Sequence, residues 1–273
     1  MDGFLLSNSE VETLLSWDRI SSRFRLLARH YRREKPSIKD TAFREVYGEL
    51  IRRIVKSRLP HEPWILKTDL WNEGVENGRN ILSLVRGASG KSEIVGVDIS
   101  GNVCGYARRE LGDDIEIVRS TLLAPPFCKR FDLIIDISTV DHIPKRLRER
   151  WISNEASLLK ENGVLLISFD CKLNIFCEVF HQLFTRRYYP EWTLSPVSIR
   201  QQLNRYGFQV LEEHAVFILG LFLGTHRPWF PFSRLLNRMR VIEAVKALEL
   251  SKCSRLLAFL APQYVLVAVK TNS

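Results

Sequence analysis

The chain has 273 residues, of which 40 are Lys or Arg and 31 are Asp or Glu, so its formal net charge is +9. Hydrophobic residues make up 45% and charged residues 26%, which is typical of a folded globular protein and excludes disordered and collagen-like chains. This length allows one elaborated α/β domain or two small domains.

Cysteine usage and hydropathy bear on the compartment. The five cysteines include no Cys-x-x-Cys pair and no His cluster beside them, so we expect no metal site and no disulfide framework. This pattern favours the reducing cytoplasm. The sequence shows no secretory signal and no run of 18 or more apolar residues that would predict a membrane span. Contact with the surface of a membrane stays open.

The first 62 residues predict a helical extension that packs on the core. Apolar residues recur at helical spacing over residues 11–33 and 41–58, and Pro36 and Pro60 end the two patterns. Between Arg19 and Arg58 the chain has thirteen Lys or Arg and four Asp or Glu. Such a basic face suggests an anionic partner, a nucleic acid among them, but a solvated helix exterior is the favoured interpretation, because runs of charge usually mean only that.

From residue 63 to 273, short apolar runs alternate with helical stretches, which predicts one α/β domain with a parallel sheet covered on both faces. Helical insertions are expected at about 172–200 and 220–258. The predicted strands are 64–69, 93–98, 115–118, 131–136, 163–168, 208–213 and 264–270. The predicted helices include 72–85, a stretch ending near 111, 145–159, 173–185 and 198–206.

Polar side chains follow two of the predicted strands. Parallel sheets bind ligands at the carboxyl ends of their strands. Asp98 ends the second strand, where a carboxylate can accept hydrogen bonds from both hydroxyls of a ribose. The same residue could instead cap the following helix. Asp136 ends the fourth strand, and Asp141 and His142 follow it.

Three stretches carry a resemblance to a known family. They are Leu123-Ala-Pro-Pro-Phe127 with Phe131-Asp-Leu-Ile-Ile after it, the run from Leu158 to Ile167 around Asn162-Gly163, and Ser195-Pro-Val-Ser-Ile-Arg with Gly207-Phe208. In this order they resemble the class I S-adenosylmethionine-dependent methyltransferases, over about residues 64–213. Within this family the chain resembles a divergent member of the "methyltransferase type 11" kind. It departs from the family after the first strand, where Thr68-Asp69 and late glycines replace a glycine-rich loop.

The resemblance implies a Rossmann-like sheet of seven strands in the order 3-2-1-4-5-7-6, with the last strand antiparallel. It also implies the donor S-adenosyl-L-methionine, lying across the ends of strands one to four. Ser120 stands where the family often has an Asp for the adenine amino group, and its hydroxyl can accept that bond. The cofactor-binding residues implied are Thr68, Asp69, Asp98, Ile99, Ser120, Thr121, Leu122, Asp136, Ile137 and Ser138.

The reaction implied is methyl transfer, in which alignment does much of the work and a base is needed only when the acceptor must lose a proton. His142 is the candidate catalytic base, and a packing role before Pro144 is its alternative. Aromatic and Arg residues in the two insertions suit a small hydrophobic or aromatic acceptor, lipid-like and negatively charged in one interpretation. Two alternatives stay open: an RNA or protein methyltransferase, and a non-catalytic binding or scaffold protein.

Overall fold

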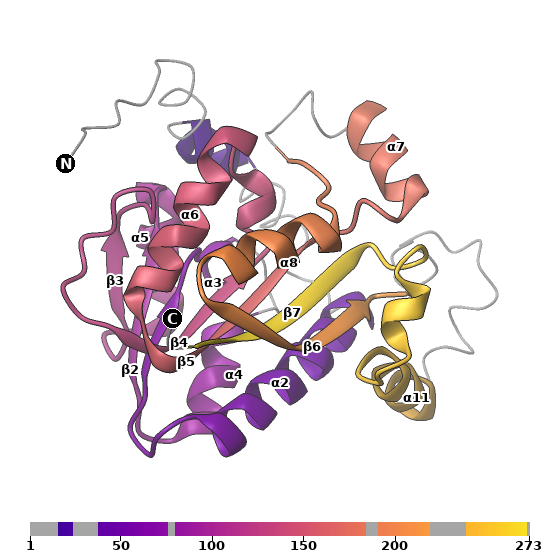
Figure 1. Cartoon of the computed structure of the whole chain (residues 1–273). Coiled ribbons are helices and arrows are strands. Elements are labelled where there is room, and N and C mark those ends of the chain that lie inside the picture. The colour runs from indigo at the N-terminus through magenta and orange to yellow at the C-terminus, as the bar shows by residue number, and fades with distance from the viewer. Residues whose placement is uncertain (1–15, 24–37, 76–79, 184–190, 219–238, 272–273) are drawn as a thin grey trace.

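The computed structural model describes residues 16–23, 38–75, 80–183, 191–218 and 239–271 (Figure 1). Its centre is a seven-stranded sheet in the order β3-β2-β1-β4-β5-β7-β6, which confirms the order expected from the sequence. The strands are β1 (Trp64–Lys67), β2 (Glu93–Asp98), β3 (Glu116–Arg119), β4 (Phe131–Ile137), β5 (Leu159–Asp170), β6 (Phe208–Val216) and β7 (Gln263–Lys270).

The middle strands are apolar because both faces of the sheet are covered. Every residue of β4 is buried, and β5 is buried from Gly163 to Phe169. β5 is longer than the predicted 163–168, since Leu159 pairs with Phe131 at one end and Asp170 with Gln263 at the other. Strands β1 to β5 run parallel, so their carboxyl ends share one edge of the sheet.

The last strand in the chain runs against its neighbours. β7 lies antiparallel between β5 and β6, with Ser168 opposite Val265 and Ala215 opposite Tyr264. The first residue of β7, Gln263, therefore lies at the edge of the sheet where the parallel strands end. This confirms the antiparallel last strand, and it brings a distant part of the chain to the ligand-binding edge.

Two hydrophobic clusters cover the two faces of the sheet. On one face, α2 (Ile38–Arg58), α4 (Ile81–Ser89) and α5 (Gly101–Leu111) supply residues such as Leu50, Leu82 and Val103 to one cluster. On the other face, α6 (Lys145–Leu158) and α8 (Pro196–Arg205) supply Trp151 and Leu203 to the second. Among the described residues, the other elements are the N-terminal helix at 16–23, α3 (Trp71–Gly74), η1 (Val140–His142), α7 (Ile175–Leu183), α11 (Met239–Glu249) and η3 (Ser254–Leu257).

Some predicted helices differ from the structure. The stretch 72–85 was expected to be one helix, but it contains α3 and α4 as separate helices, with residues 76–79 outside the described part. A new helix begins at Ile81 because Asn80 caps it, accepting a hydrogen bond from the Ser83 amide at 2.8 Å. Of the predicted helix 11–33, residues 16–23 are described and are helical.

Candidate functional site

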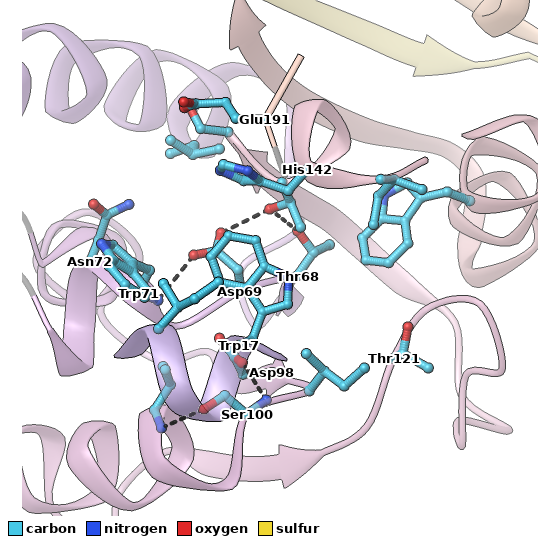
Figure 2. A pocket seen from close by; sticks show the side chains of 18 of the residues that line it. Trp17, Thr68, Asp69, Trp71, Asn72, Asp98, Ser100, Thr121, His142 and Glu191 are labelled. Atoms are coloured by element: carbon cyan, nitrogen blue, oxygen red, sulfur yellow. Dashed lines mark hydrogen bonds between the residues drawn. The ribbon is translucent and has the colours of Figure 1, made fainter. Parts of the chain in front are cut away.

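A cavity of about 340 Å³ lies at the carboxyl edge of the sheet. The tips of β1, β2 and β4, the residue after β3 and residues 16–23 contribute to its lining, and Figure 2 shows Thr68, Asp69 and Asp98 around it with Trp17 in their midst. Volumes of this size hold small-molecule ligands. The lining includes nine residues singled out from the sequence: Thr68, Asp69, Asp98, Ile99, Ser120, Thr121, Ile137, Ser138 and His142.

Two of the expected site residues lie elsewhere. Asp136 is completely buried, and its carboxylate accepts hydrogen bonds from the Trp151 indole at 2.8 Å and from the Thr139 amide at 3.1 Å. Leu122 is also completely buried and belongs to the core under α6. The structure therefore corrects the expectation that these two side chains border the cavity. Asp136 instead shapes the turn that follows β4.

Asp98 is held by the backbone around it. One of its carboxylate oxygens accepts a hydrogen bond from the Leu70 amide at 2.9 Å, and the other accepts one from the Ser100 amide at 2.7 Å. Burial is the main reason why the pKa of Asp98 rises to about 7, and the nearby charge of Asp69 adds to it. A ligand that donates hydrogen bonds to this carboxylate would stabilise its charged form.

The loop after β1 is organised by a buried lysine, which the sequence analysis did not single out. Lys67 is completely buried, and its ammonium donates to the backbone carbonyl of Asp69 at 2.6 Å and to its carboxylate at 3.1 Å. It also lies 3.5 Å from a carboxylate oxygen of Glu73. Burial alone would lower the pKa of Lys67, but Asp69 and Glu73 outweigh it and raise the pKa. A signal existed: one lysine ends an apolar strand, with acids two and six residues later.

Glu73 joins this loop to the next helix. Its other carboxylate oxygen accepts hydrogen bonds from the amides of Ile81 at 3.0 Å and Leu82 at 3.2 Å. These amides begin α4 and have no partner within the helix. The ion pairs of Lys67 and the cap by Glu73 therefore fix the conformation of the loop after β1. In the family that the sequence resembles, a glycine-rich loop occupies this position.

Asp69 faces the cavity with both carboxylate oxygens already engaged. One accepts hydrogen bonds from Lys67 and from the Thr139 hydroxyl at 2.9 Å, and the other accepts one from the Trp71 amide at 3.0 Å. Thr68 completes the group, because its hydroxyl lies 3.2 Å from that of Thr139. The Asp69 carboxylate is thereby fixed in one orientation at the cavity wall (Figure 2).

The bulky residues of the loop leave the cavity open. The Leu70 side chain is completely buried, and it packs over Gly96, where an added Cβ would lie 2.5 Å from Leu70 Cδ2. Trp71 is half-buried and forms part of the wall. The glycine that this backbone arrangement needs therefore lies in β2, below the loop, rather than in the loop itself.

His142 lies at the other end of the cavity, at the end of η1 just after β4. Its ring packs edge to face against Trp17, with ring centroids 4.9 Å apart. Its neighbour Asp141 is completely buried and accepts a hydrogen bond from the Asp170 amide at 2.9 Å. Burial raises the pKa of Asp141, with the charges of Asp170 and Glu191 adding to the rise.

Several cavity residues were missed because they come from distant segments. Trp17 comes from the N-terminal helix, and Gln263 from the start of β7. Trp151 reaches the cavity from α6. Nothing in their local sequence links them to the strand tips, so only the fold could bring them there.

Two further observations concern metals and membranes. Among the described residues, no three His, Cys, Asp or Glu side chains are grouped so that they could hold a metal ion. Within the same residues, no helix combines the length and the apolar character needed to span a bilayer.

Comparison with known proteins agrees with this architecture. A family model described as a methyltransferase domain matches residues 73–163. No curated protein gives a significant match to the sequence. The domain match and the strand order agree, and the chain has the fold of the class I S-adenosylmethionine-dependent methyltransferases.

Solved structures share the fold at low sequence identity. The chain is similar to 1,6-didemethyltoxoflavin-N1-methyltransferase of Burkholderia thailandensis, with a TM-score of 0.55, 13% identity, and coverage of 100% of this chain and 94% of that chain. For magnesium protoporphyrin IX methyltransferase of Synechocystis PCC 6803 the TM-score is 0.54, with 14% identity and 97% and 99% coverage. For the cyclase SpnF the TM-score is 0.51, with 15% identity and 83% and 81% coverage.

Proposed function

We propose that the chain is an S-adenosylmethionine-dependent methyltransferase that acts on a small acceptor in the cytoplasm. The observation that carries this proposal is the convergence of Asp69, Asp98 and His142 from three neighbouring strand tips on one cavity. Activity does not follow from the fold alone, because a cyclase shares this fold. The proposal therefore rests on the side chains at the cavity.

The residues at the tips of β1 to β3 fit the donor. Asp98 is a buried carboxylate with a raised pKa at the cavity wall, which suits an acceptor for the two hydroxyls of a ribose. Ile99, Ser120 and Thr121 would flank the adenine, with the Ser120 hydroxyl as the acceptor for its amino group. Asp69 would hold the ammonium of the amino-acid end. Two of the similar structures contain S-adenosylhomocysteine or S-adenosylmethionine.

The donor supplies a methyl group that is already activated by its attachment to a sulfonium. The chain's own residues would then have to place the acceptor, exclude water and, where the acceptor carries a proton, remove it. His142 is the candidate base for that proton, since it lines the acceptor end of the cavity beside Trp17. The adjacent Asp141 carboxylate accepts a hydrogen bond from the backbone amide of Asp170 in β5, and this bond fixes the turn that carries His142.

The lining supports a small acceptor with an apolar or aromatic body. Phe43, Trp17, Trp71 and Trp151 contribute aromatic surface, and none of the described residues that line the cavity is a Lys or Arg. This is a reason against a negatively charged acceptor, although the sequence suggested one. The aromatic and Arg residues of 184–190 and 219–238, on which that suggestion depended, lie outside the described residues. Two similar proteins carry names of small-molecule methyltransferases.

The basic N-terminal segment gives little support for an RNA or protein substrate. In α2, Arg52 pairs with Glu49, and Arg53 lies 3.2 Å from Glu212. The opposite face of the helix is buried against the sheet through residues such as Tyr47. Arg52 and Arg53 therefore already have acidic partners within the chain, as is common on the solvated face of a helix.

Binding of S-adenosylhomocysteine by isothermal titration calorimetry tests the proposal. We expect micromolar affinity in the wild type and a loss of at least about 100-fold in Asp98→Ala, since a buried charged hydrogen-bond acceptor for two hydroxyls is removed. Asp113→Asn, at an exposed turn, is the control. No detectable binding by folded wild-type protein would favour the non-catalytic alternative.

Methyl transfer itself requires a second measurement. A radiolabelled donor is incubated with a panel of small aromatic amines, phenols and carboxylates, and His142→Ala is compared with the wild type. If His142 is the base, its loss lowers kcat by about 100-fold or more for phenols, which must lose a proton, and leaves donor binding unchanged. If His142→Ala instead lowered the affinity for the donor as much as it lowered kcat, His142 would not be the catalytic base.

A further inference from the structure

The N-terminal helix, residues 16–23, is fastened to the start of α5 mainly through Asp18, and the hydroxyls of Ser21 and Ser100 also lie 3.3 Å apart. Asp18 accepts a hydrogen bond from the Ser100 hydroxyl at 2.6 Å and from the Asn102 amide at 3.1 Å, and it lies 3.3 Å from the Arg119 guanidinium. The Asn102 side chain returns two bonds to the helix, to the Asp18 carbonyl and to the Ser22 hydroxyl, both at 3.0 Å. We call this set of contacts the latch.

The latch uses the ordinary preference of helix N-termini for negative charge. The first amides of α5 have no partner within the helix, and a carboxylate that accepts one of them is stabilised there. Partial burial would raise the pKa of Asp18, but the bonds from Ser100 and Asn102 and the charge of Arg119 outweigh it and lower the pKa. Asp18 is therefore ionised throughout the neutral pH range, and the latch is closed.

The residue before Asp18 reaches the cavity. Trp17 lines it, with its ring centroid 6.0 Å from that of Trp71 and 4.9 Å from that of His142. Ile20, one turn later on the same helix, also lines the cavity. The cavity retains about 340 Å³ with Trp17 in this position, so the closed arrangement still has room for a ligand. Figure 2 shows Trp17 between the Asp98 end and the His142 end.

The latch and the ribose-binding position share one turn of the backbone. Ser100, which donates to Asp18, also donates its amide to the Asp98 carboxylate at 2.7 Å, and its hydroxyl caps α5 by accepting the Val103 amide at 3.2 Å. A ligand bound to the Asp98 carboxylate would therefore act on the same turn that carries the donor of the shortest latch bond.

We propose that Asp18 is a positioning residue that holds Trp17 as a cover over the cavity, and that occupancy of the donor site and closure of this cover stabilise each other through Ser100. The inference rests on the proposed function, since it takes Asp98 as the ribose acceptor. Coupling of this kind is reciprocal: the factor by which the ligand favours the closed cover is also the factor by which closure raises the affinity for the ligand. A variant with a weaker latch is therefore expected to bind the ligand with a higher Kd.

The rate of cleavage by trypsin measures the opening of the cover independently of methyl transfer. Arg19 and Arg23, after which trypsin cleaves, lie on the helix that carries Trp17. Cleavage after these two residues is followed by mass spectrometry, with and without S-adenosylhomocysteine, and the ligand's Kd is measured by calorimetry. In the wild type we expect the ligand to slow both cleavages. In Asp18→Asn we expect faster cleavage without ligand, and a Kd raised about 5-fold or more.

The control is Asp113→Asn, which makes the same change in charge just beyond the other end of α5. Arg119→Gln is a second variant that removes an exposed partner of Asp18 and should shift cleavage and Kd in the same direction by a smaller factor. Circular dichroism and thermal melting confirm that each variant is folded.

The outcomes separate the two proposals. If the wild type binds the ligand and Asp98→Ala does not, but Asp18→Asn leaves both Kd and protection within twofold of the wild type, the coupling is refuted and the proposed function stands. If the wild type itself does not bind the ligand, both fall. Protection that depends on Asp18 and not on Asp113 supports the latch.

Discussion

The ammonium group of Lys67 lies 3.1 Å from a carboxylate oxygen of Asp69, in a position where no part of Lys67 reaches solvent. A buried cation of this kind is stable only while its partners are present, because an unpaired charge in the interior is costly. The pair therefore links the stability of the fold directly to the shape of the cavity wall.

Lys67→Met should lower the free energy of unfolding by about 3–5 kcal/mol, since Asp69 and Glu73 would be left without their cation. Urea unfolding measures the change. The control is Lys160→Met, which breaks a 2.8 Å ion pair with Asp132 at a partly exposed position and should cost about 1 kcal/mol or less. Equal effects of the two substitutions would contradict a structural role for the buried pair.

The affinity for S-adenosylhomocysteine should depend on pH through Asp98. Its pKa without ligand is about 7, and hydrogen bonds from ribose hydroxyls favour the charged form, so binding lowers that pKa. Affinity is then full above pH 7 and falls as pH drops, by about tenfold per unit below 7. Calorimetry between pH 5.5 and 8.5 measures it, and Asp98→Asn should bind weakly with a flat profile. A wild-type affinity that is constant over this range would exclude the role of Asp98.

Gly96→Ala should affect both stability and binding. The new Cβ would lie 2.5 Å from Leu70 Cδ2, and Leu70 is completely buried, so the side chain and the amide that it donates to Asp98 must shift. We expect a loss of about 1–3 kcal/mol in chemical denaturation. Gly87→Ala, on the exposed face of α4, meets nothing within 4 Å and should gain about 0.5–1 kcal/mol. An unchanged free energy of unfolding in Gly96→Ala would contradict this prediction, because it would mean that the Leu70 side chain repacks without cost.

Glu155→Gln should make the protein less sensitive to rising pH. Burial, together with the neighbouring charge of Asp136, raises the pKa of Glu155 well above its usual range. The folded state thus holds a proton that the unfolded state releases above about pH 4.3, so this group lowers the free energy of unfolding as pH rises. Glutamine resembles the protonated form, and urea unfolding at pH 5.5 and 8 should show a smaller difference than in the wild type. Glu149→Gln, exposed on the same helix, is the control.

The sheet could be predicted from the sequence because its central strands are continuous apolar runs. β4 and β5 allow no other interpretation once helical stretches separate them, and Asp98 then falls at a strand tip by position alone. Asp136 was misplaced because its neighbour on α6, Trp151, offers a buried hydrogen bond that the local sequence does not reveal.

The cover and the charged loop could not be predicted for a different reason. The contact between Asp18 and Ser100 spans 82 residues, and no periodicity in either segment encodes it. Lys67 ends β1 where a surface lysine would also be acceptable, and only burial of the loop turns it into the partner of Asp69 and Glu73. Long-range polar contacts of this kind depend on packing, which residue patterns do not specify.

Gln263 at the start of β7 is synthesised late but forms part of the cavity wall. It donates a hydrogen bond to the Ser138 hydroxyl at 2.8 Å and receives one from Tyr47 at 3.3 Å, so three segments far apart in the chain meet at the rim. A nascent chain that has left the ribosome only as far as β6 has the acidic strand tips but lacks this bridge and the strand between β5 and β6. The cavity wall around Ser138 is therefore completed only when the strand that begins at Gln263 has joined the sheet.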